Sequence, residues 1–200
     1  MSGAADRRRE AKTFEQLWDE LERVPDDHIG EIVGGEVVAL PRPNPPHVRA
    51  CSDLGTLLGA WFRFGIGGPG GWVILDEPRI RFGDEIRVPD LAGWRVERFA
   101  ANETGPFLVI PDWICEVLSP GTTADDRTTK LPLYGRGRVG HVWLLDPLEQ
   151  TLEIYRLHGD GWLLVATFGA EAKARAEPFD AVELDLILVW GPKRASEQPG

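Results

Sequence analysis

The stretch Pro111-Asp112-Trp113-Ile114-Cys115-Glu116-Val117-Leu118-Ser119-Pro120 places one carboxylate, that of Glu116, in the middle of an apolar run. A short apolar run bounded by prolines is typical of a buried strand. An ionised carboxylate among apolar side chains is costly unless it is paired, protonated or bound to a metal. Nothing beside Glu116 in the sequence neutralises it. The stretch therefore predicts a central strand whose single acid finds its partner elsewhere in the chain.

Two other segments offer partners for Glu116. Asp90 stands among apolar residues upstream, and Lys130 follows downstream in Asp126-Arg127-Thr128-Thr129-Lys130. Two carboxylates on neighbouring strand ends can bind Mg²⁺ or Mn²⁺, which prefer oxygen ligands and leave positions for water and a phosphate. A nearby lysine can stabilise developing negative charge. Asp90, Glu116 and Lys130 thus suit phosphodiester hydrolysis, although a buried structural ion pair would also explain Glu116, and a surface pair with Asp126 would explain Lys130.

The bulk composition predicts one domain. The chain has 200 residues, 42% of them hydrophobic, with 8 Trp and 8 Phe, which is enough for a full core over residues 13–191. We expect disordered tails at 1–12 and 192–200. No apolar run approaches the ~18 residues of a membrane span, and the charged start does not suggest a signal peptide, so a cytoplasmic protein is expected. Cys51 and Cys115 are expected to be buried free thiols.

The net charge of −10 argues against a protein that coats DNA regardless of sequence, because phosphate binding needs a basic surface. The charge is unevenly spread, however. The segment 121–140 holds four bases against two acids and lies next to the proposed site. These charges either form a local positive surface or are solvated helix and loop charges.

Hydrophobic spacing predicts the order of helices and strands. A capping-box pattern starts a helix at Thr13, and a second helix follows from about His47 to Phe62. Between them Gly34-Gly35 joins two β-branched runs, 29–33 and 36–40, as a hairpin. Further strands are expected at 72–75, 79–82, 86–92, 141–145, 152–157 and 162–168.

A third helix carries Lys130 and is expected to be capped by Asp125 or Asp126. The glycine-rich segment 65–71 reads as a connection between elements, because it lacks the lysine and the flanking elements of a phosphate loop. There is no internal repeat. The order of elements predicts an α+β fold, or an α/β fold with a mixed sheet.

Seven motifs occur together along the chain. They are Phe14-Glu15-Gln16-Leu17; Gly30-Glu31-Ile32-Val33-Gly34-Gly35-Glu36; Pro43 to His47; Val88-Pro89-Asp90; Glu116-Val117-Leu118-Ser119-Pro120; the series Asp126, Lys130, Tyr134; and Trp143-Leu144-Leu145-Asp146-Pro147.

This combination, from about Phe14 to Trp190, resembles the Uma2 family of restriction endonucleases, a branch of the PD-(D/E)XK nuclease superfamily. The resemblance implies a restriction-endonuclease-like core: a central mixed sheet flanked by helices, with an N-terminal hairpin. It also implies a Mg²⁺ or Mn²⁺ site, cleavage of DNA, and a homodimer, since many nucleases of this type act with one site per strand.

The resemblance also assigns roles to individual residues. Asp90 resembles the metal-binding aspartate of the PD element, and Glu116 resembles the second acid. The superfamily pattern places a lysine where this chain has Leu118, but in the Uma2 branch the lysine lies on the following helix, which Lys130 matches. Glu31 resembles an additional N-terminal acid of the metal shell, or is an outward-facing charge of the hairpin. His47 matches a family histidine, or only starts its helix.

Two residues depart from the expected pattern. Pro132 lies two positions after Lys130, where a proline removes a helix hydrogen bond and is expected to kink the series Asp126, Lys130, Tyr134. Arg138 stands where the family usually has glycine, so the turn is expected to be strained if it needs a positive φ.

The leading hypothesis is a metal-dependent endonuclease with Asp90, Glu116 and Glu31 as metal ligands and Lys130 as the stabilising cation. The alternative from another class is an inactive module that keeps the scaffold and binds a protein or nucleic acid. A glycoside hydrolase with two carboxylates is weaker, because no aromatic platform for a sugar is visible.

Overall fold

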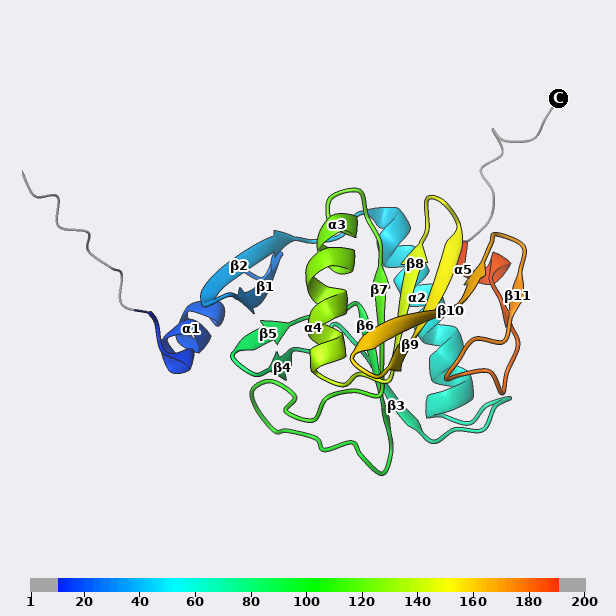
Figure 1. Ribbon diagram of the computed structural model, residues 1–200, viewed down its shortest axis with the longest axis horizontal. Coiled ribbons are helices and arrows are strands. Elements are labelled where there is room, and N and C mark those ends of the chain that lie inside the picture. The colour runs from blue at the N-terminus through cyan, green and yellow to red at the C-terminus, as the bar shows by residue number, and fades with distance from the viewer. Residues whose placement is uncertain (1–10, 191–200) are drawn as a thin grey trace, which may run out of the picture.

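A mixed sheet of six strands lies at the centre of the structure, a computed structural model that describes residues 11–190. The strand order is β10-β9-β8-β7-β6-β3, and β7 and β8 are parallel while the other neighbours are antiparallel. Helices α2 (Pro45–Leu58) and α4 (Leu131–Arg136) lie on opposite faces (Figure 1). The strands are β3 (Trp72–Asp76), β6 (Leu91–Arg95), β7 (Trp113–Val117), β8 (His141–Asp146), β9 (Thr151–His158) and β10 (Gly161–Phe168).

Strand β7 is the predicted central strand, and it is buried along its whole length. Side chains alternate between the two faces of a strand. Trp113 and Cys115 face the core under α2, whereas Ile114 faces the core under α4. Glu116, in register with Ile114, therefore points to the α4 side, where Lys130 lies. The predicted α+β fold with a central mixed sheet flanked by helices is confirmed.

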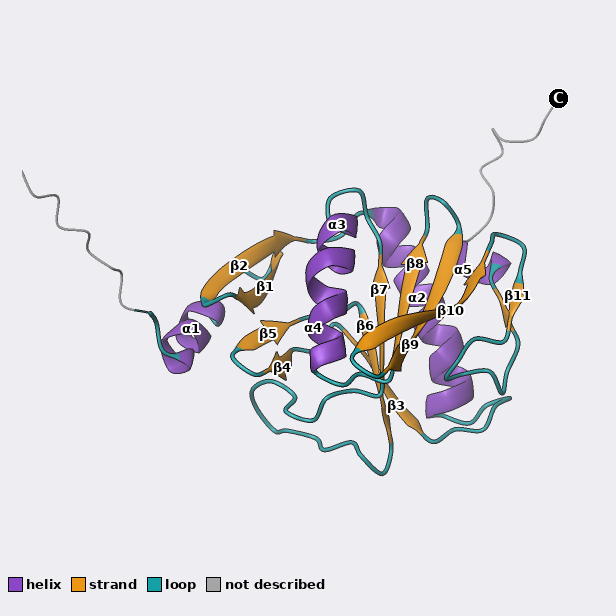
Figure 2. Ribbon diagram, viewed as in Figure 1, coloured by secondary structure: helices purple, strands orange, loops and turns teal. Residues whose placement is uncertain are grey.

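A second sheet of four strands, in the order β2-β1-β5-β4, lies beside the central one (Figure 2). Strands β1 (His28–Val33) and β2 (Glu36–Pro41) form the predicted hairpin, and β4 (Ile80–Phe82) and β5 (Glu85–Arg87) form another. Gly34 and Gly35 both have positive φ, as the tight turn requires. The remaining elements are β11 (Lys173–Ala174), β12 (Leu184–Asp185) and α5 (Ile187–Trp190).

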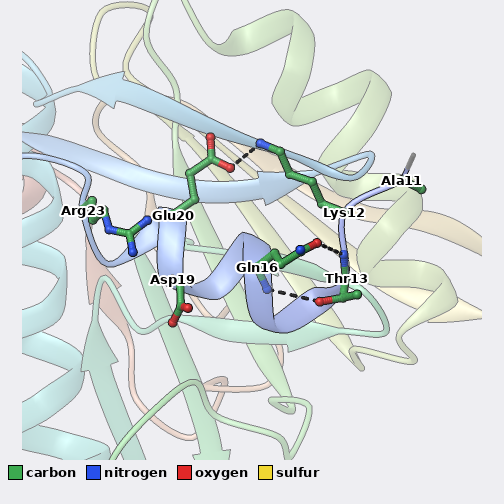
Figure 3. A pocket seen from close by; sticks show the side chains of 7 residues that line it. All are labelled: Ala11, Lys12, Thr13, Gln16, Asp19, Glu20 and Arg23. Carbon is green, nitrogen blue, oxygen red and sulfur yellow. Dashed lines mark hydrogen bonds and ion pairs between the residues drawn. The ribbon is translucent and has the colours of Figure 1, made fainter. Parts of the chain in front are cut away.

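Helix α1 (Phe14–Leu21) packs on this second sheet through its own small core, to which Leu17 and Leu21 contribute. The predicted capping box at Thr13 is confirmed: its hydroxyl accepts from the Gln16 amide at 3.3 Å, and the Gln16 side chain accepts from the Thr13 amide at 2.9 Å (Figure 3). Lys12 and Glu20 form an ion pair beside it.

One predicted strand is wrong. Residues 86–92 do not form one strand, because the chain leaves β5 after Arg87, enters the other sheet at Leu91 as β6, and has Pro89 in the break. Proline has no amide hydrogen to donate to a ladder, so pairing stops there. The break puts Asp90 at the junction of the two sheets.

The predicted cap of the third helix is also wrong. The helix begins at Thr123 with Thr122 as its N-cap residue, so Asp125 and Asp126 lie inside it. Its first turn α3 (Thr123–Asp125) continues into a π-helical turn η2 (Asp126–Lys130) and then into α4. Such π turns are rare and occur frequently at functional sites.

The two departures noted in the sequence have structural counterparts. Pro132 has no amide hydrogen to donate to the helix, and the π turn η2 ends two residues before it, at Lys130. The helix is therefore irregular in the turn where a kink was expected. Arg138 has a φ of 65°, the left-handed conformation that glycine adopts without cost. The expected strain at Arg138 is confirmed.

Several other expectations can be compared with the structure. Helix α2 starts at Pro45, two residues before His47, and continues into a second π turn, η1 (Gly59–Arg63). Both cysteines are free, with Cys115 buried and Cys51 half-buried. Within residues 11–190 no helix is long and apolar enough to cross a membrane. The single domain over 13–191 stays a prediction, and most of both expected tails lies outside the described residues.

Candidate active site

A cavity of about 340 Å³ lies where the two sheets meet. The side chains of Glu31, Asp90, Glu116 and Lys130 all line it. They come from β1, the break before β6, the end of β7 and the π turn η2, which are distant along the chain. The fold thus gathers all four predicted site residues around one cavity, while their chemical roles stay predictions.

Glu116 is almost completely buried, and each of its carboxylate oxygens has a donor. Lys130 Nζ lies 3.0 Å from Oε2, and the hydroxyl of Tyr134 donates to Oε1. Burial raises the pKa of Glu116 well above its usual range, and the charge of Lys130 opposes this rise. The buried carboxylate of Glu116 therefore finds its partners, Lys130 and Tyr134, on one face of the η2–α4 segment.

Lys130 bridges two carboxylates. Its Nζ lies 3.0 Å from Glu116 Oε2 and 3.0 Å from Asp126 Oδ1. Burial alone lowers the pKa of Lys130, but the charges of Glu116 and Asp126 outweigh it and raise the pKa above its usual value. The two carboxylates therefore favour the protonated, cationic form of Lys130.

Asp126 is buried at the same place, so the surface pair considered for Asp126 and Lys130 is wrong. Its only neighbour within ion-pair distance among the described residues is Lys130, and the side chains of Lys130 and Thr122 act as hydrogen-bond donors to its carboxylate. Burial raises the pKa of Asp126, and Lys130 opposes the rise. A third buried carboxylate, beside those of Glu116 and Glu31, therefore lines the cavity.

Asp90 is held by the strand that carries Glu116. Its Oδ2 accepts from the Val117 amide at 2.6 Å, and its Oδ1 lies 3.1 Å from His47 Nε2. His47 is itself fixed at the start of α2, where Asn44 caps the helix. The sequence left open whether His47 belongs to the site or only starts its helix. Its ring is buried and contacts Asp90, so it lies at the site, while any catalytic role stays a prediction.

Glu31 is buried too, so the outward-facing hairpin charge considered from the sequence is wrong. Its Oε1 accepts from the Val88 amide at 2.8 Å, and its Oε2 accepts from Arg87 Nη1 at 3.2 Å. Arg87 also pairs with Glu85 at 2.9 Å. These contacts tie the N-terminal hairpin to the segment that leads into Asp90.

The donor atoms around the cavity are hard oxygens of the kind that Mg²⁺ and Mn²⁺ prefer. Within residues 11–190 no group of three or more His, Cys, Asp and Glu side chains is close enough together to hold a metal ion. Magnesium usually takes only one or two carboxylates from the protein. Asp90 and Glu116 could supply two such carboxylates, although each of their oxygens already has a donor or an ion-pair partner, and Asp126 lies beside them.

Three neighbours of the site had no role assigned from the sequence: Tyr134, Arg87 and Asp126. Tyr134 and Asp126 carried a usable signal, because both stand four positions from Lys130 and so share its face of a helix. Arg87 carried none, since its contact with Glu31 depends on how the two hairpins pair.

The comparisons with known proteins agree with this fold. The chain matches over residues 15–186 the model of the Uma2 family, described as "Putative restriction endonuclease". It is similar to the crystal structure of a "putative nuclease belonging to DUF820" from Anabaena variabilis ATCC 29413, with a TM-score of 0.67 and 23% identity over 87% of this chain and 97% of that one. No curated protein matches it. Because the family model covers most of the sequence and the resemblance seen in the motifs is confirmed, the chain belongs to the Uma2 family.

Proposed function

We propose that this protein is a metal-dependent endonuclease that hydrolyses DNA phosphodiester bonds in the cavity between its two sheets. The observation that carries the proposal is the meeting of Asp90, Glu116 and Lys130 around that cavity from three separate segments. Membership of the Uma2 family supports the reaction class. Two acids that could hold a metal ion and one cation that could stabilise negative charge suit such hydrolysis.

Asp90 and Glu116 would hold Mg²⁺ or Mn²⁺, and Glu31 would be a further acid of the same shell. When bound, such an ion polarises the phosphate and lowers the pKa of a coordinated water. The Val117 amide and His47 orient the Asp90 carboxylate. Lys130 has three donor hydrogens, of which Glu116 and Asp126 take two, and the third is available to a phosphate oxygen.

The alternative is an inactive module that binds a protein or nucleic acid. One observation favours it: Glu116 has a donor on each oxygen, so its burial is explained without a metal. A purely structural network would keep Glu116 buried in the same way. It gives no reason, however, for bringing Asp90 and Asp126 to the wall of the same cavity.

We also propose a homodimer, formed through β10. This strand ends the order of the central sheet, and its eight residues carry no charge. Leu163, Leu164 and Val165 are exposed in succession. At the opposite edge η1 packs beside β3, and Arg63 donates to the Ile74 carbonyl at 3.2 Å. Edge strands that carry neither charge nor cover tend to pair with another strand, and a second copy offers an equally uncharged one.

The test is a cleavage assay on plasmid and oligonucleotide DNA with Mg²⁺ or Mn²⁺. Purified protein is expected to cut DNA only with the metal, and Glu116→Gln and Asp90→Asn are expected to lower the rate by at least about 100-fold. Matched controls are Glu149→Gln and Asp84→Asn, which make the same chemical changes at exposed positions. A folded protein that cuts no DNA with either metal would favour the binding module.

A further inference from the structure

Seven ionisable side chains line the cavity, and six of them lie deep. Arg42 is the exception, because 50% of its side chain is accessible. Asp90 is the most exposed of the six, with 14% of its side chain accessible, and none of the other five exceeds 8%. The others are Glu31, His47, Glu116, Asp126 and Lys130. A phosphodiester must therefore enter the cavity to reach them, because they do not stand on the surface of the protein.

The cavity is small compared with a DNA duplex. Its volume of about 340 Å³ equals that of a cube with an edge of about 7 Å, whereas the major groove of B-DNA alone is about 12 Å wide. The hairpin segment Leu40–Asn44 forms one wall, and Ser119, Gly121 and Thr122 form part of the other. One nucleotide unit fits such a space, but two paired strands do not.

The cations around the cavity are already engaged. Arg42 donates to the Glu77 carboxylate at 2.6 Å and to the Asp26 carbonyl at 3.2 Å, and Lys130 is shared by Glu116 and Asp126. Binding along a duplex needs several bases that each neutralise a phosphate. Among the residues that line this cavity, none supplies such a row.

The apolar part of the lining contains no aromatic ring. It consists of Ile29, Leu40, Pro41, Pro43, Val88 and Val117. Such a wall can pack against the sugar and base of one nucleotide, but it offers no ring on which successive bases would stack. It can hold one unit of a strand without reading its sequence.

We infer that the substrate of this site is an unpaired DNA segment, such as a single strand, a flap or a frayed end, from which one nucleotide unit enters the cavity. This rests on the proposed nuclease function and adds the class of DNA to it. An unpaired nucleotide turns into a pocket freely, whereas one in a duplex must first unstack and unpair at a cost of a few kcal/mol.

The experiment compares three labelled substrates of one sequence: a single strand, a blunt duplex, and a duplex with an unpaired flap. With Mn²⁺ or Mg²⁺ the single strand and the flap are expected to be cut with a kcat/KM at least about 10-fold above that of the duplex. Glu116→Gln, run in parallel, excludes a contaminating nuclease. Equal or faster cutting of the duplex overturns this inference alone, whereas no cutting of any substrate overturns the proposed function as well.

Two variants test the role of the cavity itself. Leu40→Trp fills the cavity wall and is expected to lower kcat/KM on the single strand at least about 10-fold. Ala39→Trp places the same indole at the neighbouring, exposed position of β2, whose side chain points to the other face, and is expected to change little. Thermal unfolding verifies that both variants fold. Full activity of folded Leu40→Trp overturns the inference.

The salt dependence of binding is an independent readout. If one or two phosphates are engaged, log K for the single strand falls with log[salt] with a slope of about −1, because each neutralised phosphate contributes about −0.7. The slope is measured with the Glu116→Gln protein to prevent cutting. A slope steeper than about −4 would indicate a long phosphate track and overturn the inference.

Discussion

Lys130 Nζ lies 3.0 Å from Glu116 Oε2, and this contact joins the π turn η2 to the most deeply buried strand of the sheet. The same ammonium lies 3.0 Å from Asp126 Oδ1. One positive charge thus serves two buried carboxylates, and the pair Asp90–His47 stands beside them. The carboxyl groups that line the cavity outnumber its lysine and arginine side chains, and those that are ionised attract a cation.

The hydroxyl of Tyr134 is expected to stabilise the protein through Glu116. Tyr134→Phe removes one oxygen and leaves Glu116 Oε1 buried without its donor, which should lower the free energy of unfolding by about 1–3 kcal/mol. Urea unfolding measures it. The matched control is Tyr155→Phe, because Tyr155 donates to Glu153 at 2.8 Å in a more exposed place. A loss no greater for Tyr134→Phe than for Tyr155→Phe would contradict the account.

Arg138 should be replaceable by glycine with a gain in stability. Its φ of 65° is costly for any residue with a Cβ, so Arg138→Gly is expected to raise the free energy of unfolding by about 0.5–1 kcal/mol, despite the loss of exposed contacts to Gly159 and Asp160. Arg136→Gly, in the last turn of α4, should lower it by a similar amount. Both variants are compared by chemical denaturation. If both raised or both lowered the free energy of unfolding, the positive φ of Arg138 would not be the cause.

These residues show how far the sequence alone could lead. Local spacing and backbone chemistry were enough to predict strand β7, helix α1 and the β1–β2 hairpin. They also predicted the strained turn at Arg138. The cost of burying an unpaired charge predicted that Glu116 has a partner, and Lys130 was one of the two candidates. The break at Pro89 was missed, although a proline inside an apparent strand is a signal against that strand.

Other features depend on tertiary packing and leave no local signal. The contact of His47 with Asp90 requires α2 to lie against β7, and that of Arg87 with Glu31 requires the two hairpins to share a sheet. The helix start at Thr123 was missed because Asp125 and Asp126 are good capping residues whose side chains are used elsewhere.

The ion pair between Arg127 and Glu153 gives the protein part of its acid sensitivity. The hydrogen bond from Arg127 lowers the pKa of Glu153 below its usual value, so the folded state binds the proton less tightly than the unfolded state. The contribution is therefore present above the unfolded pKa, near 4.5, and is lost as the pH falls through the lower folded pKa. Because the pair is partly exposed, the effect is small.

Urea unfolding of the wild type and Glu153→Gln between pH 3 and 7 checks this sign. The difference in free energy of unfolding between the two proteins should be largest near neutral pH and shrink below about pH 4.5. Glu149→Gln, at an exposed position, serves as the control and should show no such trend. A difference that grows as the pH falls would contradict the assignment.

A charge on the outer edge of the central sheet should separate the two copies of the proposed dimer. Leu164→Lys puts two like charges near the two-fold axis of paired β10 strands and is expected to shift the protein to a monomer in sedimentation velocity. Leu188→Lys, on α5, adds the same charge at another exposed leucine and should leave the dimer intact. A wild-type monomer, or a Leu164→Lys dimer, would rule out the β10 interface.

Titration of Mn²⁺ into the purified protein by calorimetry tests the central claim most directly. The wild type is expected to bind the metal, Asp90→Ala and Glu116→Ala are both expected to lose that binding while remaining folded, and Asp84→Ala and Glu149→Ala, at exposed positions, are expected to keep it. Equal binding by all five proteins, or no binding by the wild type, would show that the carboxylates around this cavity serve only to pair with Lys130, Tyr134 and His47.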